Sequence, residues 1–278
     1  MRVLRFTCGL ALSAALAGIA LSRTAAAVDR LPCAAPQAIS QFDAPLNGFV
    51  RAIERTREIR IVAIGSSSTE GTGASSKQKA FPARFDFEMD RLFPGKDFQV
   101  ANLGKGGELA EEMMARLVGD VIPMQPALVV LQTGVNDANQ GVELAAFEKI
   151  LVAGLAALKA AGIEAVLVDP QFYPRPATVP RYEDYIAVMH RVAKAHGVPV
   201  FRRYAIMKHL VASGQFSVDA LLWRDKFHLN DVSYGCLAEL MASAMAAHVR
   251  QRATPEMVAQ GRTPPPATSA GDGQSINF

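Results

Sequence analysis

An alternation along the chain restricts the fold more than any other feature. Short apolar runs of strand length are separated by longer segments whose apolar residues recur at helical spacing. This pattern is typical of a parallel sheet covered by helices, because each crossover between parallel strands needs a connecting element of that length. The expected strands cover residues 59–64, 98–102, 127–132, 165–168 and 198–201. The expected helices cover residues 81–92, 109–117, 144–161, 182–195 and 231–250.

The first 27 residues have the pattern of a secretory signal peptide. Arg2 and Arg5 precede an apolar run of roughly fifteen residues, and Ala25-Ala26-Ala27 supplies the small residues of a cleavage site. We therefore expect residues 1–27 to be removed and the mature protein to be periplasmic or secreted, with no stable membrane insertion. A retained signal anchor is the alternative reading, but the apolar run is short for a bilayer span.

The remaining chain is expected to form one domain and a tail. Residues 28–252 contain all the expected strands and helices, and half of the whole sequence is apolar (50%), which suffices for one well-buried α/β core. Residues 253–278 are rich in proline, glycine and polar residues, and they lack the apolar content to pack. We therefore expect this tail to be disordered.

Charge gives no support for a nucleic-acid partner. The formal net charge of the full chain is +3, and removal of residues 1–27 takes away Arg2, Arg5 and Arg23 and no acidic residue, which leaves zero. A mature chain without a positive surplus has no sequence-level case for binding phosphate backbones. The oligomeric state is not determined by the sequence.

Two cysteines, Cys33 and Cys236, remain after removal of the signal peptide. Export would place them in an oxidising compartment, where a disulfide persists. Such a bridge would tie the mature N-terminus to the last helix. Two unrelated buried thiols fit the sequence equally well, because a sequence does not show how closely two Cα atoms approach.

Three polar motifs each stand at the carboxyl end of one of the first three expected strands. They are Gly65-Ser66-Ser67, the segment from Asn102 to Gly107, and Gly134-Val135-Asn136-Asp137. Reactive groups of an open parallel sheet gather at this edge, where the loops are free and helix N-termini point their N–H groups outward. We therefore expect the motifs to form one site, together with Asp225 and His228 from a turn before the last helix.

Each motif alone has a simpler interpretation. Serines before a helix most often cap it, a glycine cluster is usually a flexible turn, and an Asn-Asp pair is usually an Asx turn or cap. A single histidine before a helix is more often a surface residue. The joint occurrence of all four motifs in one order is what favours a functional site.

In this order the motifs resemble the four signature blocks of SGNH, or GDSL, hydrolases. These enzymes carry Ser, Gly, Asn and a closing Asp-x-x-His pair, and the resemblance extends from about residue 60 to residue 228. It implies a three-layer α/β/α sandwich of flavodoxin-like type with a five-stranded parallel sheet. It also implies a serine hydrolase that cleaves carboxylic esters and needs neither a cofactor nor a metal.

The resemblance assigns Ser67 as the nucleophile, because Gly65-Ser66-Ser67 aligns with the family's Gly-Asp-Ser. His228 would be the general base, and Asp225 would orient its imidazole. The family usually has Asp at position 66, where the carboxylate holds the turn. We expect the Ser66 hydroxyl to accept these hydrogen bonds more weakly.

The same resemblance implies three donors to a developing oxyanion. These are the backbone N–H groups of Ser67 and Gly107 and the side-chain amide of Asn136, with Gly104 as the fallback for Gly107. Asp137 is expected to fix its loop rather than to react.

The sequence contains no motif that indicates another kind of catalytic, nucleotide-binding or metal site. There is no P-loop, dinucleotide fingerprint, Gly-x-Ser-x-Gly elbow, zinc spacing or calcium loop. The other four histidines have no neighbouring carboxylate like that of His228; they are His190, His196, His209 and His248.

The substrate is left open by the sequence. A short acyl group, such as acetyl on a glycan, is favoured mildly because no long apolar lid is present. The alternatives are a lipid esterase, an acyltransferase, and a noncatalytic carbohydrate-binding protein suggested by Ser66. The segment 169–182 is expected to rim the site, either contacting a sugar through its aromatic and basic residues or serving as a rigid proline-rich loop.

Overall fold

The structure is a computed structural model, and it describes residues 33–174, 179 and 181–252. The signal peptide and tail expected from the sequence lie outside these residues. The described part holds a five-stranded, all-parallel sheet with the order β2-β1-β3-β4-β5. This is the flavodoxin-like order. In such sheets, ligands bind at the carboxyl ends of the strands, near the point where the strand order reverses. The strands are β1 (Glu58–Gly65), β2 (Asp97–Gly104), β3 (Leu128–Gln132), β4 (Ala165–Val168) and β5 (Val200–Phe201).

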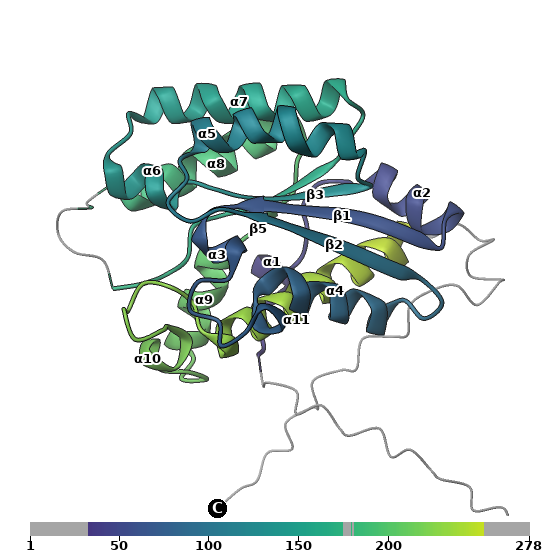
Figure 1. The fold of residues 1–278 in the computed structure, drawn as a ribbon. Coiled ribbons are helices and arrows are strands. Elements are labelled where there is room, and N and C mark those ends of the chain that lie inside the picture. Colours follow the sequence, from purple (N-terminus) through teal and green to yellow (C-terminus); the bar gives the residue numbers. More distant parts are fainter. Residues whose placement is uncertain (1–32, 175–178, 180, 253–278) are drawn as a thin grey trace, which may run out of the picture. The chain divides into compact units, whose positions relative to one another are not determined.

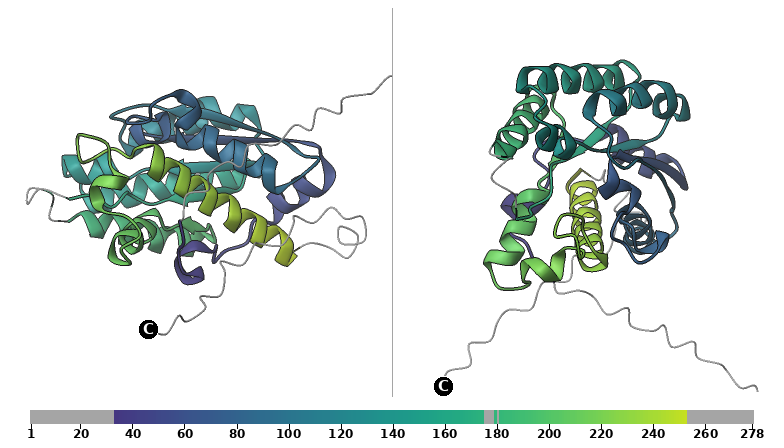
Figure 2. Two further views of the ribbon diagram at one scale, coloured as in Figure 1. Left: turned by 90° about the horizontal axis from the view of Figure 1, so that it is seen from below. Right: turned by 60° about the vertical axis from the view of Figure 1, so that its left-hand side comes forward.

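Helices cover both faces of the sheet (Figure 1). On one face α7 packs against α5 and α8, and on the other α4 packs against α11, as the turned views of Figure 2 also show. The α-helices are α1 (Gln37–Ser40), α2 (Asn47–Arg55), α3 (Ser67–Glu70), α4 (Phe81–Leu92), α5 (Ala110–Arg116), α6 (Val135–Gln140), α7 (Leu144–Ala160), α8 (Tyr182–His196), α9 (Arg203–Ala212), α10 (Val218–Leu221) and α11 (Asp231–Arg252). Single turns of other helix types are η1 (Lys77–Lys79), η2 (Leu117–Val121) and η3 (Ile122–Met124).

Burial explains why the strands read as apolar runs. Every residue of β3 and β4 is buried, as are the last five residues of β1, because helices cover both faces of these inner strands. The edge strand β2 is only partly buried, so its sequence is more polar.

The expected α/β/α fold with five parallel strands is confirmed. The expected helix boundaries agree with the structure to within two residues, since capping and apolar spacing are local signals. Two strand boundaries differ by two residues from the expected ones: β2 continues to Gly104, and β5 begins at Val200. Helices α2 and α9 were not anticipated. None of the described helices is long and apolar enough to span a bilayer.

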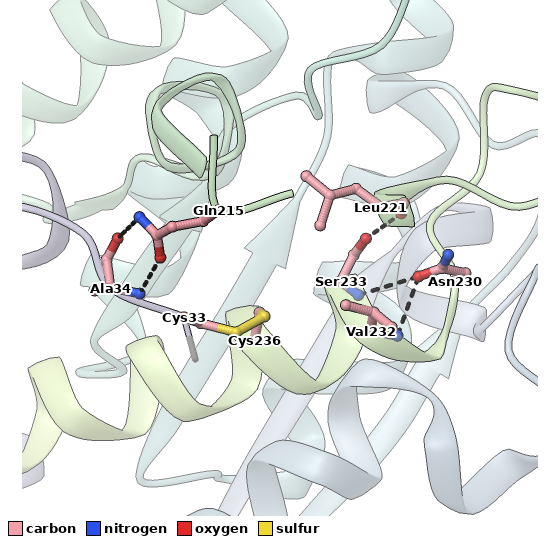
Figure 3. The surroundings of a disulfide bond; sticks show 8 residues. All are labelled: Cys33, Ala34, Gln215, Leu221, Asn230, Val232, Ser233 and Cys236. Atoms are coloured by element: carbon pink, nitrogen blue, oxygen red, sulfur yellow. Dashed lines mark hydrogen bonds between the residues drawn. A yellow bond between two sulfur atoms is a disulfide. The ribbon is translucent and has the colours of Figure 1, made fainter. Parts of the chain in front are cut away.

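The disulfide that the sequence left open is present between Cys33 and Cys236 (Figure 3), with the two Cα atoms 5.5 Å apart. It joins the start of the described chain to the first turns of α11. Next to it, the side chain of Gln215 bonds both the N–H and the carbonyl of Ala34, at 2.9 and 3.0 Å. These contacts hold the N-terminal segment against the domain.

Candidate active site

Ser67 lies where the central strand β1 turns into the short helix α3. A side chain at Gly65, the last residue of β1, would collide with the hydroxyl of Thr69, so this position requires glycine. Ser66 has an extended backbone (φ −89°, ψ −151°), and Ser67 then begins α3. The N–H of Ser67 belongs to the first helical turn and therefore has no partner within the helix.

The structure brings three of the expected site residues into one hydrogen-bonded chain. His228 Nε2 lies 2.9 Å from Ser67 Oγ, although the two residues are 161 positions apart. His228 Nδ1 lies 2.6 Å from Asp225 Oδ2. With the Nδ1 proton directed at the carboxylate, Nε2 is left to accept the serine proton. A serine nucleophile with a general base and an orienting carboxylate would require this geometry.

Asp225 is held by the turn to which it belongs. Its Oδ1 accepts the N–H groups of Phe227 at 3.0 Å and His228 at 2.9 Å. Burial alone would raise the pKa of Asp225, but the hydrogen bonds from the His228 side chain and these two N–H groups lower the pKa below its usual value. The carboxylate is therefore ionised wherever a histidine can serve as a base.

Gln132, a residue that the sequence interpretation missed, holds the turn that carries Ser67. Its Oε1 accepts the Ser66 N–H at 3.1 Å, the Ser66 hydroxyl at 3.3 Å and the Thr69 hydroxyl at 3.1 Å. The expectation that Ser66 would itself accept the hydrogen bonds of this turn was wrong, because its hydroxyl donates and the acceptor comes from the neighbouring strand β3. The only signal in the sequence is a polar residue that closes an otherwise apolar run.

The loop after β2 lies against the nucleophile. The Lys105 N–H donates to the carbonyl of Gly65 at 2.9 Å, and a Cβ on Gly106 would lie 3.9 Å from Ser67 Cβ. Gly107 takes a positive φ of 79°, a conformation that favours glycine. The position of Gly106 beside the nucleophile was not anticipated.

Gly104, the fallback oxyanion donor, is less suited to that role than Gly107. It is the last residue of β2, and its N–H already donates to Asn102 Oδ1 at 2.9 Å. Gly107 lies beyond the strand, in the turn next to the nucleophile.

Glu108 fixes this loop through both its backbone and its side chain. Its carbonyl accepts Asn136 Nδ2 at 2.8 Å, which uses one of the two amide hydrogens of Asn136. Its carboxylate is buried and binds Arg116 through two N–H groups at 2.6 and 2.5 Å. The hydrogen bonds that Arg116 donates to this carboxylate raise the pKa of Arg116. The loop that carries Gly107 and the side chain of Asn136 are therefore held together.

Asp137 bonds to the backbone of the same region. Its Oδ1 accepts the N–H of Ala110, the first residue of α5, at 3.1 Å. Burial raises the pKa of Asp137, and the side chain is directed at the helix start. This contact agrees with a role in holding the loop.

The segment 169–182 packs against the turn that carries His228. The rings of Tyr173 and Phe227 meet edge to face at 4.8 Å, and Phe227 meets the His228 ring in the same way at 4.7 Å. Tyr173 and Tyr182 are both buried, so these rings support the turn and are not exposed platforms for a sugar. Residues 175–178 and 180 of this segment lie outside the described residues.

Two of the other histidines have partners that the sequence did not reveal. His190 Nε2 lies 2.9 Å from Asp169 Oδ2, and His248 accepts the N–H of Leu46 at 3.1 Å. Both contacts join residues that are distant in sequence. Among the described residues, no cluster of three or more histidine, cysteine or acidic side chains is arranged to hold a metal.

Comparisons with known proteins agree with this architecture. The model of a family described as the non-GDSL lipase-like family matches residues 32–251. Among solved structures, a two-domain esterase active on acetylated mannans has a TM-score of 0.63 and 19% identity over 76% of this chain and 56% of its own. The present chain therefore spans little more than half the length of that protein. No curated protein matches the sequence.

Two smaller proteins are similar over nearly their whole length. The acetyl xylan esterase AlAXEase has a TM-score of 0.58 and 20% identity, covering 67% of this chain and 99% of its own. A lipase/acylhydrolase from Enterococcus faecalis has a TM-score of 0.57 and 23% identity, covering 71% of this chain and 98% of its own. At these identities, the likeness establishes the fold.

Proposed function

The chain belongs to the non-GDSL lipase-like family, and on that premise we propose that it is an exported serine esterase that forms an acyl-enzyme on Ser67. Family membership agrees with the resemblance to SGNH/GDSL-type hydrolases, and it supports an enzyme that hydrolyses esters. The observation that carries the finer proposal is the hydrogen-bonded chain from Asp225 through His228 to Ser67, at 2.6 and 2.9 Å.

In the proposed first step, Ser67 Oγ attacks the ester carbonyl while His228 Nε2 takes its proton. Asp225 stabilises the imidazolium that forms. The negative charge on the carbonyl oxygen would be met by the N–H groups of Ser67 and Gly107 and the second amide hydrogen of Asn136. Each such donor contributes about 3 kcal/mol to lowering the barrier in other enzymes.

Collapse of the tetrahedral intermediate then breaks the bond to the alcohol. His228 returns the proton to the departing oxygen, which leaves as a neutral alcohol, and the acyl group remains on Ser67. A water molecule next attacks the acyl carbonyl and gives a proton to His228. Release of the acid restores the Ser67 hydroxyl, so the cycle consumes one water for each ester.

A cleft of mixed polarity lies beside the site, and its polar side chains favour a glycan ester over a fatty one. It has a volume of about 790 Å³ and runs along the outer edge of β2 to Glu70, which shares helix α3 with Ser67. Its lining includes Arg60, Lys77 and Asn102. Such side chains suit hydroxyl groups better than an acyl tail. The mannan- and xylan-active esterases among the structural relatives support an acetyl group as the one removed.

Export is part of the proposal. The signal-like residues 1–27 support it, and so does the Cys33–Cys236 disulfide, since such bonds persist mainly in oxidising compartments. Intact-mass analysis of protein recovered from the periplasm or medium should give a chain that begins near Val28. A cell-associated protein with residues 1–27 intact would contradict it.

Labelling with a fluorophosphonate tests the nucleophile. We expect one adduct on Ser67, no adduct on Ser67→Ala, and normal labelling of the matched control Ser68→Ala. A folded wild-type protein that stays unlabelled and inactive on all esters would favour a noncatalytic binding protein.

Release from p-nitrophenyl esters of increasing chain length tests the acyl group. Faster turnover of the acetyl ester than of the octanoyl ester, together with acetate release from acetylated mannan or xylan, is expected. A strong gain with chain length would instead indicate a lipid esterase.

A further inference from the structure

A small enclosed cavity lies directly behind the nucleophile turn. It has a volume of about 20 Å³, which suffices for one particle of the size of a water molecule. Its wall combines apolar side chains of the sheet and of α11 with polar residues, and no acidic residue lines it. The polar residues are Ser68, Thr69, Gln132, Arg203 and Tyr234. None of the groups assigned to the esterase reaction borders it.

Two buried donors of this wall lack a protein acceptor. Gln132 and Arg203 are each 3% exposed. The Oε1 atom of Gln132 serves the nucleophile turn, and Arg203 Nε donates to the carbonyl of Asp169 at 2.8 Å. Among the described residues, neither Gln132 Nε2 nor Arg203 Nη2 has a hydrogen-bond partner. An unmatched buried donor costs about 1–3 kcal/mol, so one such group in a cavity points to a ligand and two point to it more strongly.

The charge of Arg203 is also poorly matched. The nearest carboxylate, Asp169, already accepts the Tyr204 N–H at 2.8 Å through Oδ1 and contacts His190 at 2.9 Å through Oδ2. Burial lowers the pKa of Arg203, which reflects the cost of a cation at this depth. Two hydroxyl groups of residues that also line the cavity have partners elsewhere: Thr69 donates to Gln132 Oε1 at 3.1 Å, and Tyr234 donates to the carbonyl of Thr72 at 2.7 Å. A water molecule would accept from both free donors but would not offset the charge.

We infer that the cavity is a binding site for one small monovalent anion of the chloride class, held between Arg203 Nη2 and Gln132 Nε2. The anion satisfies both donors and offsets the guanidinium charge. By fixing the amide of Gln132, it also fixes the acceptor that holds Ser66 and Thr69. The site is thus a structural anion site that supports the nucleophile turn.

Anomalous diffraction from protein equilibrated and crystallised in bromide tests the site directly. We expect one strong bromide peak in the cavity, between the two donor atoms. Density at this position that carries no anomalous signal would identify a water molecule and overturn the inference. The experiment involves no substrate, so its outcome is independent of the proposed esterase activity.

Thermal unfolding in chloride at constant ionic strength, with gluconate as the replacement anion, gives a second readout. Above the dissociation constant, Tm should rise by about 3–5 °C for each tenfold increase in chloride. Lys194→Met removes an exposed cation and should keep this dependence, whereas Arg203→Met should lose it. A chloride-independent Tm of the wild-type protein would contradict the site.

Gln132→Glu covers the case in which Arg203→Met does not fold. A carboxylate at position 132 keeps one oxygen for Ser66 and offers the other to Arg203, so it replaces the anion within the chain. This variant should fold, show no bromide peak, and have a Tm that no longer depends on chloride. A bromide peak that persists in Gln132→Glu would refute the assignment of the donors.

Discussion

Replacing Arg116 by methionine would leave the buried carboxylate of Glu108 with the exposed Lys105, whose Nζ lies 3.8 Å from Glu108 Oε1, but without the two hydrogen bonds from the guanidinium. The Glu108 side chain is 2% exposed and that of Arg116 is 22% exposed. Removing one partner of a buried pair costs about 3–5 kcal/mol, and the partial exposure of Arg116 argues for the lower end, about 3 kcal/mol at pH 7.

In Arg116→Met, the two N–H groups that the carboxylate accepts in the wild-type protein are lost. We therefore expect the free energy of unfolding to fall by about 3 kcal/mol at pH 7.

Equilibrium urea unfolding of the wild-type protein and Arg116→Met at pH 7 measures the effect. The matched control is Arg191→Met, which breaks an ion pair with Glu148 whose side chains are 58% and 38% exposed. Because exposed ion pairs contribute little, the control should lose much less stability than Arg116→Met. Equal losses for the two variants would refute the reasoning.

Four further predictions concern the site and the disulfide. Asp225→Asn should lower kcat for p-nitrophenyl acetate by about 10³–10⁴ with little change in KM, because the imidazole loses its orienting carboxylate. Asn136→Ala should lower kcat by about 10²–10³, and a change confined to KM would argue against an oxyanion role. The pKa of Asp225 is lowered in the folded protein. The ionised carboxylate therefore stabilises the fold above about pH 4, and this stabilisation is lost as the pH falls through the folded pKa. The difference in urea stability between the wild-type protein and Asp225→Asn should accordingly shrink at acidic pH. Replacing Cys33 and Cys236 by serine should cost about 2–5 kcal/mol in urea unfolding while kcat at low temperature stays unchanged.

Much of the fold was predictable because its signals are local. The continuous apolar runs that became β1, β3 and β4 reflect burial on both faces, and the spacing in α4 and α7 reflects one buried helical face. Helix α9 was missed because its apolar residues do not form one clear stripe. Helix α2 was missed because it precedes the first strand, so the alternation of strands and helices along the chain did not call for it.

The candidate site was predictable for residues that stand in recognisable motifs. Ser67, Asp225 and His228 were named from the sequence, and the structure places them within hydrogen-bonding distance. Gln132 and Arg203 belong to no motif. Their importance comes from which atoms lie opposite them, and this depends on how β3, α3 and α9 pack.

By itself, the sequence predicted the five strands, the long helices that alternate with them and the candidate reactive groups, because hydrophobic periodicity and short motifs act over a few residues. The tertiary structure alone decided that Cys33 meets Cys236, that Glu108 meets both Arg116 and Asn136, and that a buried amide holds the nucleophile turn. Hydrogen bonds and disulfides require contact within a few ångströms, and for residues far apart in the chain that contact depends on how the whole sheet and its helices pack.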